Sequence, residues 1–315
     1  MVMKIKPSSL PVGNTPLVRM QHVFSSQALQ FYAKLEYMNP GGSIKDRTAT
    51  RIIKRAIENR HITRETTIVE STSGNMGIGL ARICRLMGLR LVLVVDPYIN
   101  PQAEKILRAF GAELVCVEED DGKGGFLNTR LQKVKDLLDT LPDSFHPDQY
   151  TNPDNPGAHF ETVKEILQSL QRVPDYIFVP TSTCGTLMGI YGGLENLGHQ
   201  TRLVAVDAEG SVIFKDTSAK RRIPGMGSSR PSSFVKTEKI YRVLHIAEKD
   251  IVAACRRVVE TEAMIIGGSS GAVIAAVTQL SPEIPPGSDV VGIFADSGER
   301  YLDTIYNETW VNAGQ

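Results

Sequence analysis

The sequence predicts an α/β protein built from two open twisted sheets with flanking helices. Short apolar runs of strand length alternate with longer amphipathic runs of helix length through most of the 315 residues. Turns rich in Gly, Ser and Thr join several of these runs, and no repeat of solenoid period is present. The Pro- and Asp-rich stretch Pro142–Pro156 interrupts the alternation and predicts a boundary between two lobes.

In the first half, a turn at Gly13-Asn-Thr-Pro-Leu17 leads into strand-like pieces. Strands are expected at residues 31–36, 67–70, 90–95 and 113–117, and helices after Ser43 and at 76–87, 101–111 and about 126–138. Pro101 suits the first position of its helix, where a missing N–H costs nothing. Because strands and helices alternate here, the region is expected to form a parallel sheet.

The second half resumes the alternation after the boundary. Strands are expected at 176–179, 203–206 and 289–294, and helices at 157–170, after 186, near 249–261 and at 270–280. The two halves together therefore predict two sheets with a cleft between them.

Composition excludes several classes of protein. The chain is 42% hydrophobic and 22% charged, and its formal net charge is zero. A basic excess, typical of proteins that bind nucleic acid or anionic membranes, is absent. No apolar run approaches membrane-spanning length and the N-terminus lacks a leader pattern, so we expect a cytoplasmic protein.

The cysteines and histidines predict neither disulfides nor a metal site. Cys84, Cys116, Cys184 and Cys255 are widely separated, without a Cys-x-x-Cys pair, and the six histidines do not cluster. Cys84, Cys116 and Cys255 lie in apolar segments, where we expect them to be buried small residues.

Residues 39–47 (Asn39-Pro-Gly-Gly-Ser-Ile-Lys-Asp-Arg47) form the pattern of a sharp turn that leads into a helix. Ser43 is suited to cap this helix, so Lys45 is expected in its first turn, at a fixed and crowded place. Desolvation and the positive end of a helix both lower the pKa of an amine, which can then attack a carbonyl group. A solvent-exposed lysine is the alternative, and the local pattern does not decide between the two.

Three further turns follow strands, and in open α/β sheets ligands bind at the carboxyl ends of strands. Ser71-Thr-Ser-Gly-Asn75 suits a carboxylate, although a plain capping turn has the same composition. Ser182-Thr-Cys-Gly-Thr186 suits a phosphate dianion and is neither a Walker A loop nor a dinucleotide fingerprint. Asp296-Ser-Gly-Glu-Arg300 can direct one hydroxyl or one carboxylate group into the cleft.

Lys45 and the three turns supply an amine nucleophile, a carboxylate site, a phosphate site and a single polar group. This is the inventory needed to bind pyridoxal 5'-phosphate together with an amino acid. The combination is much more specific than any of its parts. We therefore predict pyridoxal 5'-phosphate as the cofactor and small-molecule amino acids as substrates.

Four motifs carry a resemblance to a known family: residues 39–47, Thr72-Ser-Gly-Asn75, Asn152-Pro-Asp-Asn-Pro156 with His159, and Asp296-Ser-Gly-Glu-Arg300. From Gly13 to about Tyr301 the chain resembles cysteine synthase and the other fold type II pyridoxal phosphate enzymes, which share the fold of the tryptophan synthase β subunit. The resemblance implies a homodimer. It also implies a large cofactor-binding domain (1–40 and 151–315) and a small mobile domain (41–150).

The resemblance also assigns roles to residues. Lys45 would form the internal aldimine, Asn75 would bond to the ring hydroxyl of the cofactor, and Ser297 would meet the ring nitrogen. The cofactor phosphate would be bound by Ser182, Thr183, Cys184, Gly185 and Thr186. A hydroxyl partner does not force protonation of the ring, which favours expulsion of a β leaving group over transamination. Asp296 is the rival partner, and its carboxylate would reverse this argument.

The chain departs from cysteine synthases at three places. They usually read Gly-Thr-Gly-Gly-Thr at the phosphate turn and carry phenylalanine where this chain has Tyr150, and Gly124-Gly-Phe-Leu-Asn-Thr-Arg130 adds an arginine. These changes resemble the branch that makes N-(2-amino-2-carboxyethyl)-L-glutamate from O-phospho-L-serine and L-glutamate through an aminoacrylate. That reaction leads to 2,3-diaminopropionate in siderophore biosynthesis. The guanidinium of Arg130 would suit both anionic substrates, although a solvated helix arginine is the alternative.

The substrate-binding residues expected on these grounds are Ser71, Thr72, Ser73, Gly74, Asn75, Arg130, Tyr150, Ser182, Met226 and Ser228. Three other functions stay open. The chain could be a cysteine synthase that uses O-acetylserine or O-phosphoserine with sulfide, or a serine or threonine dehydratase. It could also be a catalytically inactive relative that acts as a binding subunit.

Overall fold

The computed structural model describes residues 11–25, 28–72, 74–122 and 125–313. The chain divides into two compact units, each with its own sheet. Unit 1 contains Lys45–Asp154, and unit 2 contains Gly13–Ile44 and Asn155–Gln315. The α/β class with two sheets and flanking helices is the class that the sequence predicts.

Unit 1 contains a four-stranded sheet in which every pairing is parallel, as the alternating pattern predicts. Its order is β5 (Glu113–Cys116), β4 (Arg90–Val95), β3 (Thr67–Ser71) and β6 (Ser144–Phe145). The carboxyl ends of parallel strands meet at one edge of a sheet. The turns after β3, β4 and β6 therefore share that edge.

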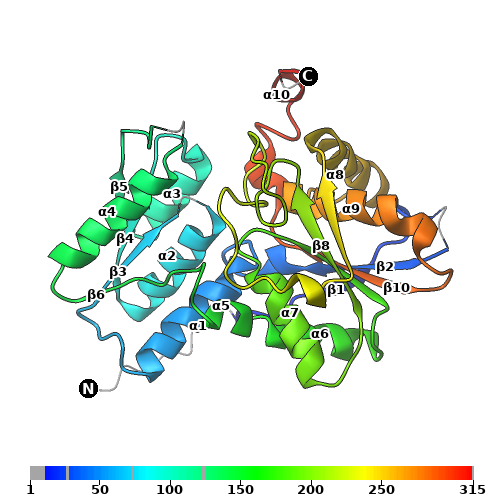
Figure 1. Ribbon diagram of the computed structural model, residues 1–315, viewed down its shortest axis with the longest axis horizontal. Helices are drawn as coiled ribbons and strands as arrows, with labels where there is room; N and C mark the ends of the chain where they lie inside the picture. The colour runs from blue at the N-terminus through cyan, green and yellow to red at the C-terminus, as the bar shows by residue number, and fades with distance from the viewer. Residues whose placement is uncertain (1–10, 26–27, 73, 123–124, 314–315) are drawn as a thin grey trace. The chain divides into compact units, whose positions relative to one another are not determined.

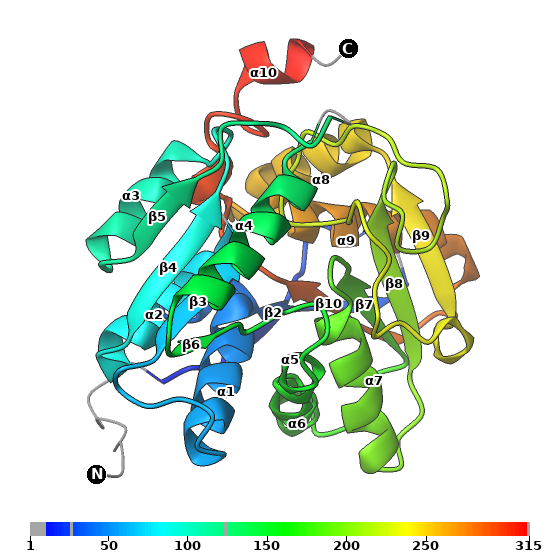
Figure 2. The ribbon, with the colours of Figure 1, turned by 60° about the vertical axis from the view of Figure 1, so that its left-hand side comes forward.

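Helices cover both faces of this sheet (Figure 2). α1 (Lys45–Glu58), α2 (Asn75–Met87) and α3 (Pro101–Ala109) pack against one face, where Ile68, Leu91 and Leu93 point. α4 (Leu127–Thr140) covers the other face through Val134, which packs with Val69, Val92 and Val94. Successive strand residues alternate between the faces, and the central strand β4, which is covered on both faces, is apolar from Leu91 to Val95.

Unit 2 contains a six-stranded sheet, in which only the pairing of the first two strands in its order is antiparallel. The order is β1 (Leu17–Arg19), β2 (Gln30–Leu35), β10 (Asp289–Phe294), β7 (Tyr176–Pro180), β8 (Arg202–Ala208) and β9 (Arg242–Ile246). α8 (Glu248–Glu262) and α9 (Gly268–Leu280) cover one face, and α6 (Phe160–Leu170) and α7 (Gly185–Asn196) cover the other (Figure 1).

The remaining elements are short. They are the helices α5 (Asp154–Gly157) and α10 (Glu308–Asn312) and the 3-10 turns η1 (Glu36–Met38), η2 (Thr237–Lys239), η3 (Ser281–Glu283) and η4 (Gly298–Tyr301). The sequence did not indicate β6, β9 or α5. The helix expected from Gly157 begins at Phe160, because α5 and its exit occupy the residues before it.

Two local predictions were wrong. Cys116 is exposed, because it is the last residue of the edge strand β5, which is exposed at both ends and half-buried between them; Cys84 and Cys255 are buried, and all four cysteines are free thiols. Ser43 does not directly precede α1. It forms an isolated bridge with Asp296, which leaves Ile44 as the residue before the helix.

Candidate active site

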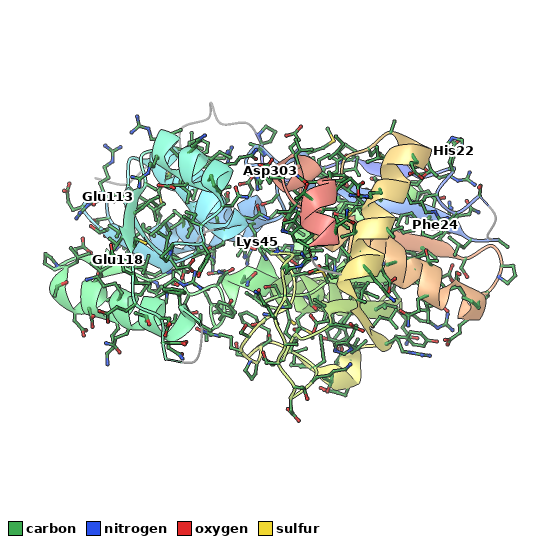
Figure 3. The ribbon with its side chains drawn as sticks, turned by 90° about the horizontal axis from the view of Figure 1, so that it is seen from above. His22, Phe24, Lys45, Glu113, Glu118 and Asp303 are labelled. Atoms are coloured by element: carbon green, nitrogen blue, oxygen red, sulfur yellow. The ribbon has the colours of Figure 1, made fainter. Side chains whose placement is uncertain are left out.

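Lys45 is the first residue of α1 and is half-buried (Figure 3). The preceding residue, Ile44, donates its backbone N–H to the carbonyl oxygen of Ala295 at 2.8 Å. Ser43 pairs with Asp296 in the same segment of unit 2. Because consecutive Cα atoms lie about 3.8 Å apart, the backbone of Lys45 begins one peptide unit beyond a fixed hydrogen bond.

The turn before Lys45, residues 39–44, makes hydrogen bonds to Arg300 and to Glu36 within unit 2. Arg300 donates from Nη2 to the carbonyl oxygen of Gly41 at 2.6 Å. Gly42 has a φ of +79°, and a Cβ there would lie 2.7 Å from the same Nη2 atom. Asn39 donates to the backbone and the carboxylate of buried Glu36 at 2.8 and 2.9 Å. Glycine is therefore required where the turn approaches the guanidinium.

The predicted carboxylate turn joins β3 to α2. Ser71 is the last residue of β3, Asn75 is the first residue of α2, and Thr72 between them is buried. Gly74 precedes the helix and is exposed, and a Cβ placed on it would meet nothing within 4 Å. Ser73 lies outside the described residues. This turn therefore offers an open backbone surface at the positive end of a helix.

The predicted phosphate turn joins β7 to α7. Cys184 stands at the N-cap of α7 with a φ of +63° and is buried. The first bond of the helix runs from the N–H of Met188 to the carbonyl of Cys184 at 3.0 Å. The N–H groups of Gly185 and Thr186 precede that bond and have no acceptor within the helix, and the Gly185 N–H makes only a long contact, at 3.4 Å, with the Thr183 hydroxyl. Such N–H groups at the positive end of a helix suit a phosphate group.

Asn155, from the Asn152–Pro156 motif, and His159 contact this turn within unit 2. Asn155 donates to the Thr183 hydroxyl at 3.1 Å, and Nε2 of His159 lies 3.2 Å from the Thr186 hydroxyl. A Cβ on Gly185 would lie 2.2 Å from Oδ1 of Asn155. These contacts therefore fix the shape of the turn. The close approach of Asn155 requires glycine at position 185.

In the third turn, residues 296–300, Asp296 and Ser297 have different surroundings. From the sequence, either side chain could be the partner of the cofactor ring nitrogen. Asp296 is 2% exposed, and its Oδ2 accepts a hydrogen bond from the Tyr301 hydroxyl at 2.7 Å. Burial and the Asp296 charge raise the pKa of Tyr301 well above its usual value. Ser297 is half-buried, and within the described part of the chain its hydroxyl accepts one long contact, at 3.4 Å, from the N–H of Glu299. The Ser297 hydroxyl is thus more available to bind a ligand than the Asp296 carboxylate.

Arg130 and Tyr150 both belong to unit 1. Nη1 of Arg130 forms an ion pair with Oδ2 of Asp96 at 3.1 Å, and the two side chains are 18% and 14% exposed. Arg130 is therefore not a fully solvated helix arginine. Tyr150 is half-buried.

Met226 and Ser228 belong to unit 2 and are buried. Ser228 donates its N–H to the Ser211 hydroxyl at 3.1 Å, and Gly227 donates its N–H to the carbonyl of Thr181 at 2.7 Å. Thr181 directly precedes the phosphate turn. This contact fixes the segment of Met226 and Ser228 against that turn.

Each unit brings together its own part of the predicted set. Unit 1 holds Lys45, the carboxylate turn, Arg130 and Tyr150, and unit 2 holds the phosphate turn, Met226, Ser228 and Ser297. An amine, a helix N-terminus shaped for an anion and an uncommitted hydroxyl are the groups that pyridoxal phosphate requires. The residues present therefore fit this cofactor, which would supply the electron sink when bound.

Two residues beside the carboxylate turn carry no signal in the sequence. Glu70, 3% exposed, directly precedes the turn, and Nε2 of His146 lies 3.1 Å from its Oε1. His146 follows the two-residue strand β6, which is too short for a periodic pattern. Only the pairing of β6 with β3 brings the two side chains together.

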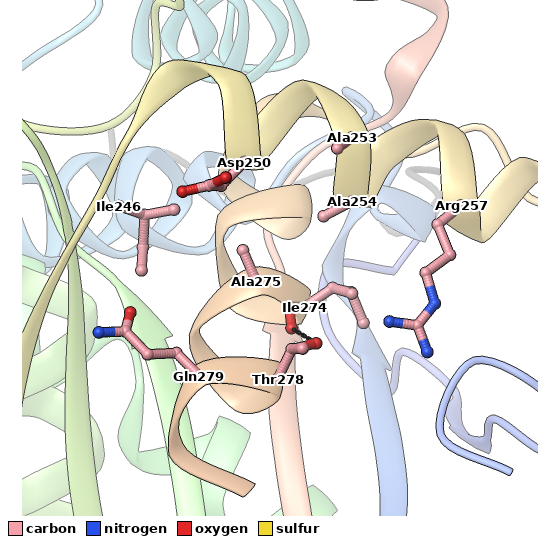
Figure 4. A pocket seen from close by; sticks show the side chains of 9 residues that line it. All are labelled: Ile246, Asp250, Ala253, Ala254, Arg257, Ile274, Ala275, Thr278 and Gln279. Atoms are coloured by element: carbon pink, nitrogen blue, oxygen red, sulfur yellow. Dashed lines mark hydrogen bonds between the residues drawn. The ribbon is translucent and has the colours of Figure 1, made fainter. Parts of the chain in front are cut away.

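A cavity of about 360 Å³ lies apart from all these residues, between α8 and α9 in unit 2 (Figure 4). It is lined by Ile246, Asp250, Ala253, Ala254, Arg257, Ile274, Ala275, Thr278 and Gln279. The Thr278 hydroxyl already donates to the Ile274 carbonyl at 2.9 Å. None of the predicted site residues lines this cavity.

The described residues offer neither a membrane-spanning helix nor a cluster of metal ligands. None of their helices is both long and apolar enough to cross a lipid bilayer. No group of three or more His, Cys, Asp or Glu side chains among them is placed to hold a metal ion.

Comparison with known proteins identifies the family. The model of the family described as "Pyridoxal-phosphate dependent enzyme" matches residues 8–296. Among solved structures, the O-acetylserine dependent cystathionine beta-synthase from Helicobacter pylori is 31% identical, with a TM-score of 0.86 over 94% of this chain and 97% of that one. A hydrogen sulfide-producing enzyme from Fusobacterium nucleatum is 31% identical, with a TM-score of 0.85 over 92% and 97%.

O-ureido-L-serine synthase is 28% identical, with a TM-score of 0.87 over 96% of this chain and 97% of that one. The similarity to all three proteins covers both units, and the family match includes Lys45, the carboxylate turn and the phosphate turn. This chain therefore belongs to the pyridoxal-phosphate dependent enzyme family, and pyridoxal phosphate is its cofactor.

Proposed function

We propose that this enzyme catalyses a β-replacement in which the phosphate of O-phospho-L-serine is exchanged for the amine of L-glutamate. The products are N-(2-amino-2-carboxyethyl)-L-glutamate and phosphate. The C–O bond to the phosphate breaks, a C–N bond to glutamate forms, and the glutamate amine loses a proton. The coarser class, a pyridoxal phosphate-dependent β-replacement of the cysteine synthase type, agrees with the family and with the solved relatives.

The choice of these two substrates rests on the burial and the hydrogen bonding of Arg130. Its guanidinium is only 18% exposed and is paired with Asp96 through Nη1. Its Nε is buried and has no hydrogen-bond partner among the described residues. A guanidinium with an unused buried donor suits a further anion, such as a phosphate or a second carboxylate. Acetate and sulfide bring less negative charge and do not require it.

The protein residues have separate tasks in this proposal. The turn of Thr72–Asn75 holds the α-carboxylate of the amino acid, and Lys45 removes the α proton as general base. Arg130 stabilises the phosphate as it leaves. Ser297 contacts the ring nitrogen without protonating it, because Asp296 is engaged with Tyr301. A ring that is not forced into its protonated form favours loss of a β group over transamination.

One observation favours a second candidate, a cysteine synthase that uses O-acetylserine or O-phosphoserine with sulfide. The Asp96 carboxylate offsets the charge of Arg130, so the pair adds little net attraction for an anion. The relative from Helicobacter pylori is named as O-acetylserine dependent. A catalytically inactive binding subunit remains the alternative from another class, and Lys45 and both turns weigh against it.

One assay separates these functions. The purified enzyme is given O-phospho-L-serine or O-acetyl-L-serine together with L-glutamate or sulfide, and the products are identified by mass. We expect phosphate release that depends on glutamate and a product of the mass of the joined amino acids. Cysteine as the sole product would replace the proposal by the second candidate. A colourless protein without turnover would favour the third alternative, a catalytically inactive binding subunit.

We also propose the setting of this activity from the resemblance of the sequence to the glutamate-using branch. The enzyme acts on small amino acids in the cytoplasm as a homodimer, in a route to 2,3-diaminopropionate for siderophore biosynthesis. Sedimentation of the purified enzyme tests the homodimer, and loss of 2,3-diaminopropionate on gene deletion tests the route.

A further inference from the structure

The carboxylate of Glu70 is buried directly before the turn that is proposed to bind the substrate carboxylate. Glu70 is 3% exposed and lies near the carboxyl end of β3, between its neighbours β4 and β6. Oε1 accepts the backbone N–H of Ser71 at 2.9 Å. This bond places a negative charge beside the first residue of the turn and removes that N–H from the groups available to a ligand.

His146 is the side chain that meets this carboxylate, and its imidazole ring carries a positive charge when it is protonated. It follows β6, which pairs in parallel with β3 so that Phe145 lies opposite Ile68. Its Nε2 lies 3.1 Å from Oε1 of Glu70. Within the described part of the chain, the Ser71 N–H and His146 are the contacts of this carboxylate, and Oε2 is buried without a hydrogen-bond partner.

Two negative charges would meet at this turn if Glu70 were not compensated. A buried carboxylate is costly to ionise without a partner, and like charges at close range repel strongly in a medium that water does not screen. The N-terminus of α2 attracts anions, but it would attract the substrate carboxylate and Glu70 alike. A positive charge on His146 would cancel that of Glu70 and leave the helix end to the substrate.

We propose that His146, as an imidazolium paired with Glu70, is a positioning residue that allows the Thr72–Asn75 turn to bind the α-carboxylate of an amino acid. The ligand class is an α-amino acid with a free carboxylate. This inference rests on the proposed function only in that the substrate is an α-amino acid. It does not depend on which group leaves or which nucleophile enters.

The test uses ligands that bind without a replaceable β group. The holoenzyme is titrated with L-alanine and with L-alaninamide, which lacks the carboxylate, and the change in cofactor absorbance gives each affinity. The variants are His146→Gln, Glu70→Gln and the double variant. His61→Gln is the matched control, because His61 is an exposed histidine of the same unit. Thermal unfolding of each variant reports whether it is folded.

We expect His146→Gln to weaken L-alanine binding by about tenfold or more and to leave L-alaninamide within about twofold. The double variant recovers most of the loss, because no charge then remains to be compensated. We expect Glu70→Gln alone to bind L-alanine at least as tightly as wild type. This variant tests whether the charge of Glu70 opposes carboxylate binding even if His146→Gln does not fold.

Equal losses for both ligands in His146→Gln, or no recovery in the double variant, would assign His146 a purely structural role and overturn the inference. A wild-type enzyme that responds to neither ligand would instead overturn the proposed function and this inference with it. A wild type that binds L-alanine but uses another leaving group or nucleophile contradicts only the substrates proposed above.

Discussion

The Tyr301 hydroxyl donates a 2.7 Å hydrogen bond to Oδ2 of Asp296, and both side chains are buried within unit 2. The other oxygen, Oδ1, packs so closely on Gly267 that a Cβ there would lie 2.0 Å away. Gly267 is the N-cap of α9, and the positive end of that helix favours an ionised carboxylate. Asp296 is thus committed to the interior of its unit, which supports the proposal that Ser297 is the partner of the cofactor ring.

Ser297→Asp tests this division of roles. A carboxylate at this position would favour the protonated ring of the cofactor, so we expect β-replacement turnover to fall by at least about tenfold while the cofactor stays bound. Ser297→Ala is the matched variant, which should keep most of the turnover because it adds no charge. Turnover rates with the cofactor absorbance measured in parallel provide the check. Unchanged turnover in Ser297→Asp would argue against a contact with the ring.

Tyr301→Phe should destabilise the protein by about 1–3 kcal/mol, because it leaves the buried Asp296 carboxylate without this donor. The pKa of Tyr301 is raised above its ordinary value of 10.0, so its contribution is complete below pH 10 and is lost as the pH rises through the higher folded-state pKa. Urea unfolding at pH 8 and above pH 10 measures both effects. The difference between wild type and variant should shrink at the higher pH; a constant difference contradicts the account.

Lys45→Ala should abolish the visible absorbance of the bound cofactor and lower turnover by about 1,000-fold or more, since both the amine and the general base are removed. Lys54→Ala is the control, because Lys54 lies on the same helix and stays half-buried without a described partner. Absorbance spectra and single-turnover assays are sufficient. If Lys45→Ala kept both properties, the assignment of the amine would be refuted.

Gly185→Ala should weaken cofactor binding by about tenfold or more, because its Cβ would meet Oδ1 of Asn155 at 2.2 Å and displace the turn. Gly192→Ala lies on the same helix, and its Cβ would meet only the ring of Phe160, at 3.1 Å. That ring can shift, so the control should bind the cofactor normally. Titration of the apoenzyme with pyridoxal phosphate distinguishes them. Equal affinities would show that the contact with Asn155 does not shape the site.

Arg130→Gln should lower kcat/KM for O-phospho-L-serine by about 10- to 100-fold, the usual effect of losing a charge-assisted hydrogen bond. O-acetyl-L-serine, if used at all, should be affected much less. Arg108→Gln provides the control, because Arg108 is an exposed arginine of unit 1 that also pairs with a carboxylate. Equal effects on the two donors would favour a structural role for the Arg130–Asp96 pair.

The periodic segments of the chain were predictable because the physical signal in them is local. β4 and β10 occupy the predicted residues, and α2 and α3 differ from their predictions by one residue and two residues at one end. β6 and β9 were missed. β6 is two residues long, and residues 242–246 mix arginine and histidine with apolar side chains at the edge of a sheet. The boundaries of the large and small domains and the mobility of residues 41–150 stay predictions.

The sequence by itself indicated the chemical groups of this protein and its family: an amine at the start of a helix, and two polar turns that lead into helices. These features are local, so their spacing along the chain is enough to reveal them. Only the tertiary structure decided which neighbours each group has. Asp296 accepts a hydrogen bond from Tyr301, five residues further along the same segment, because both side chains turn into the interior of unit 2. Arg130 pairs with Asp96 and Glu70 with His146, because the fold of unit 1 brings together side chains that are distant in sequence.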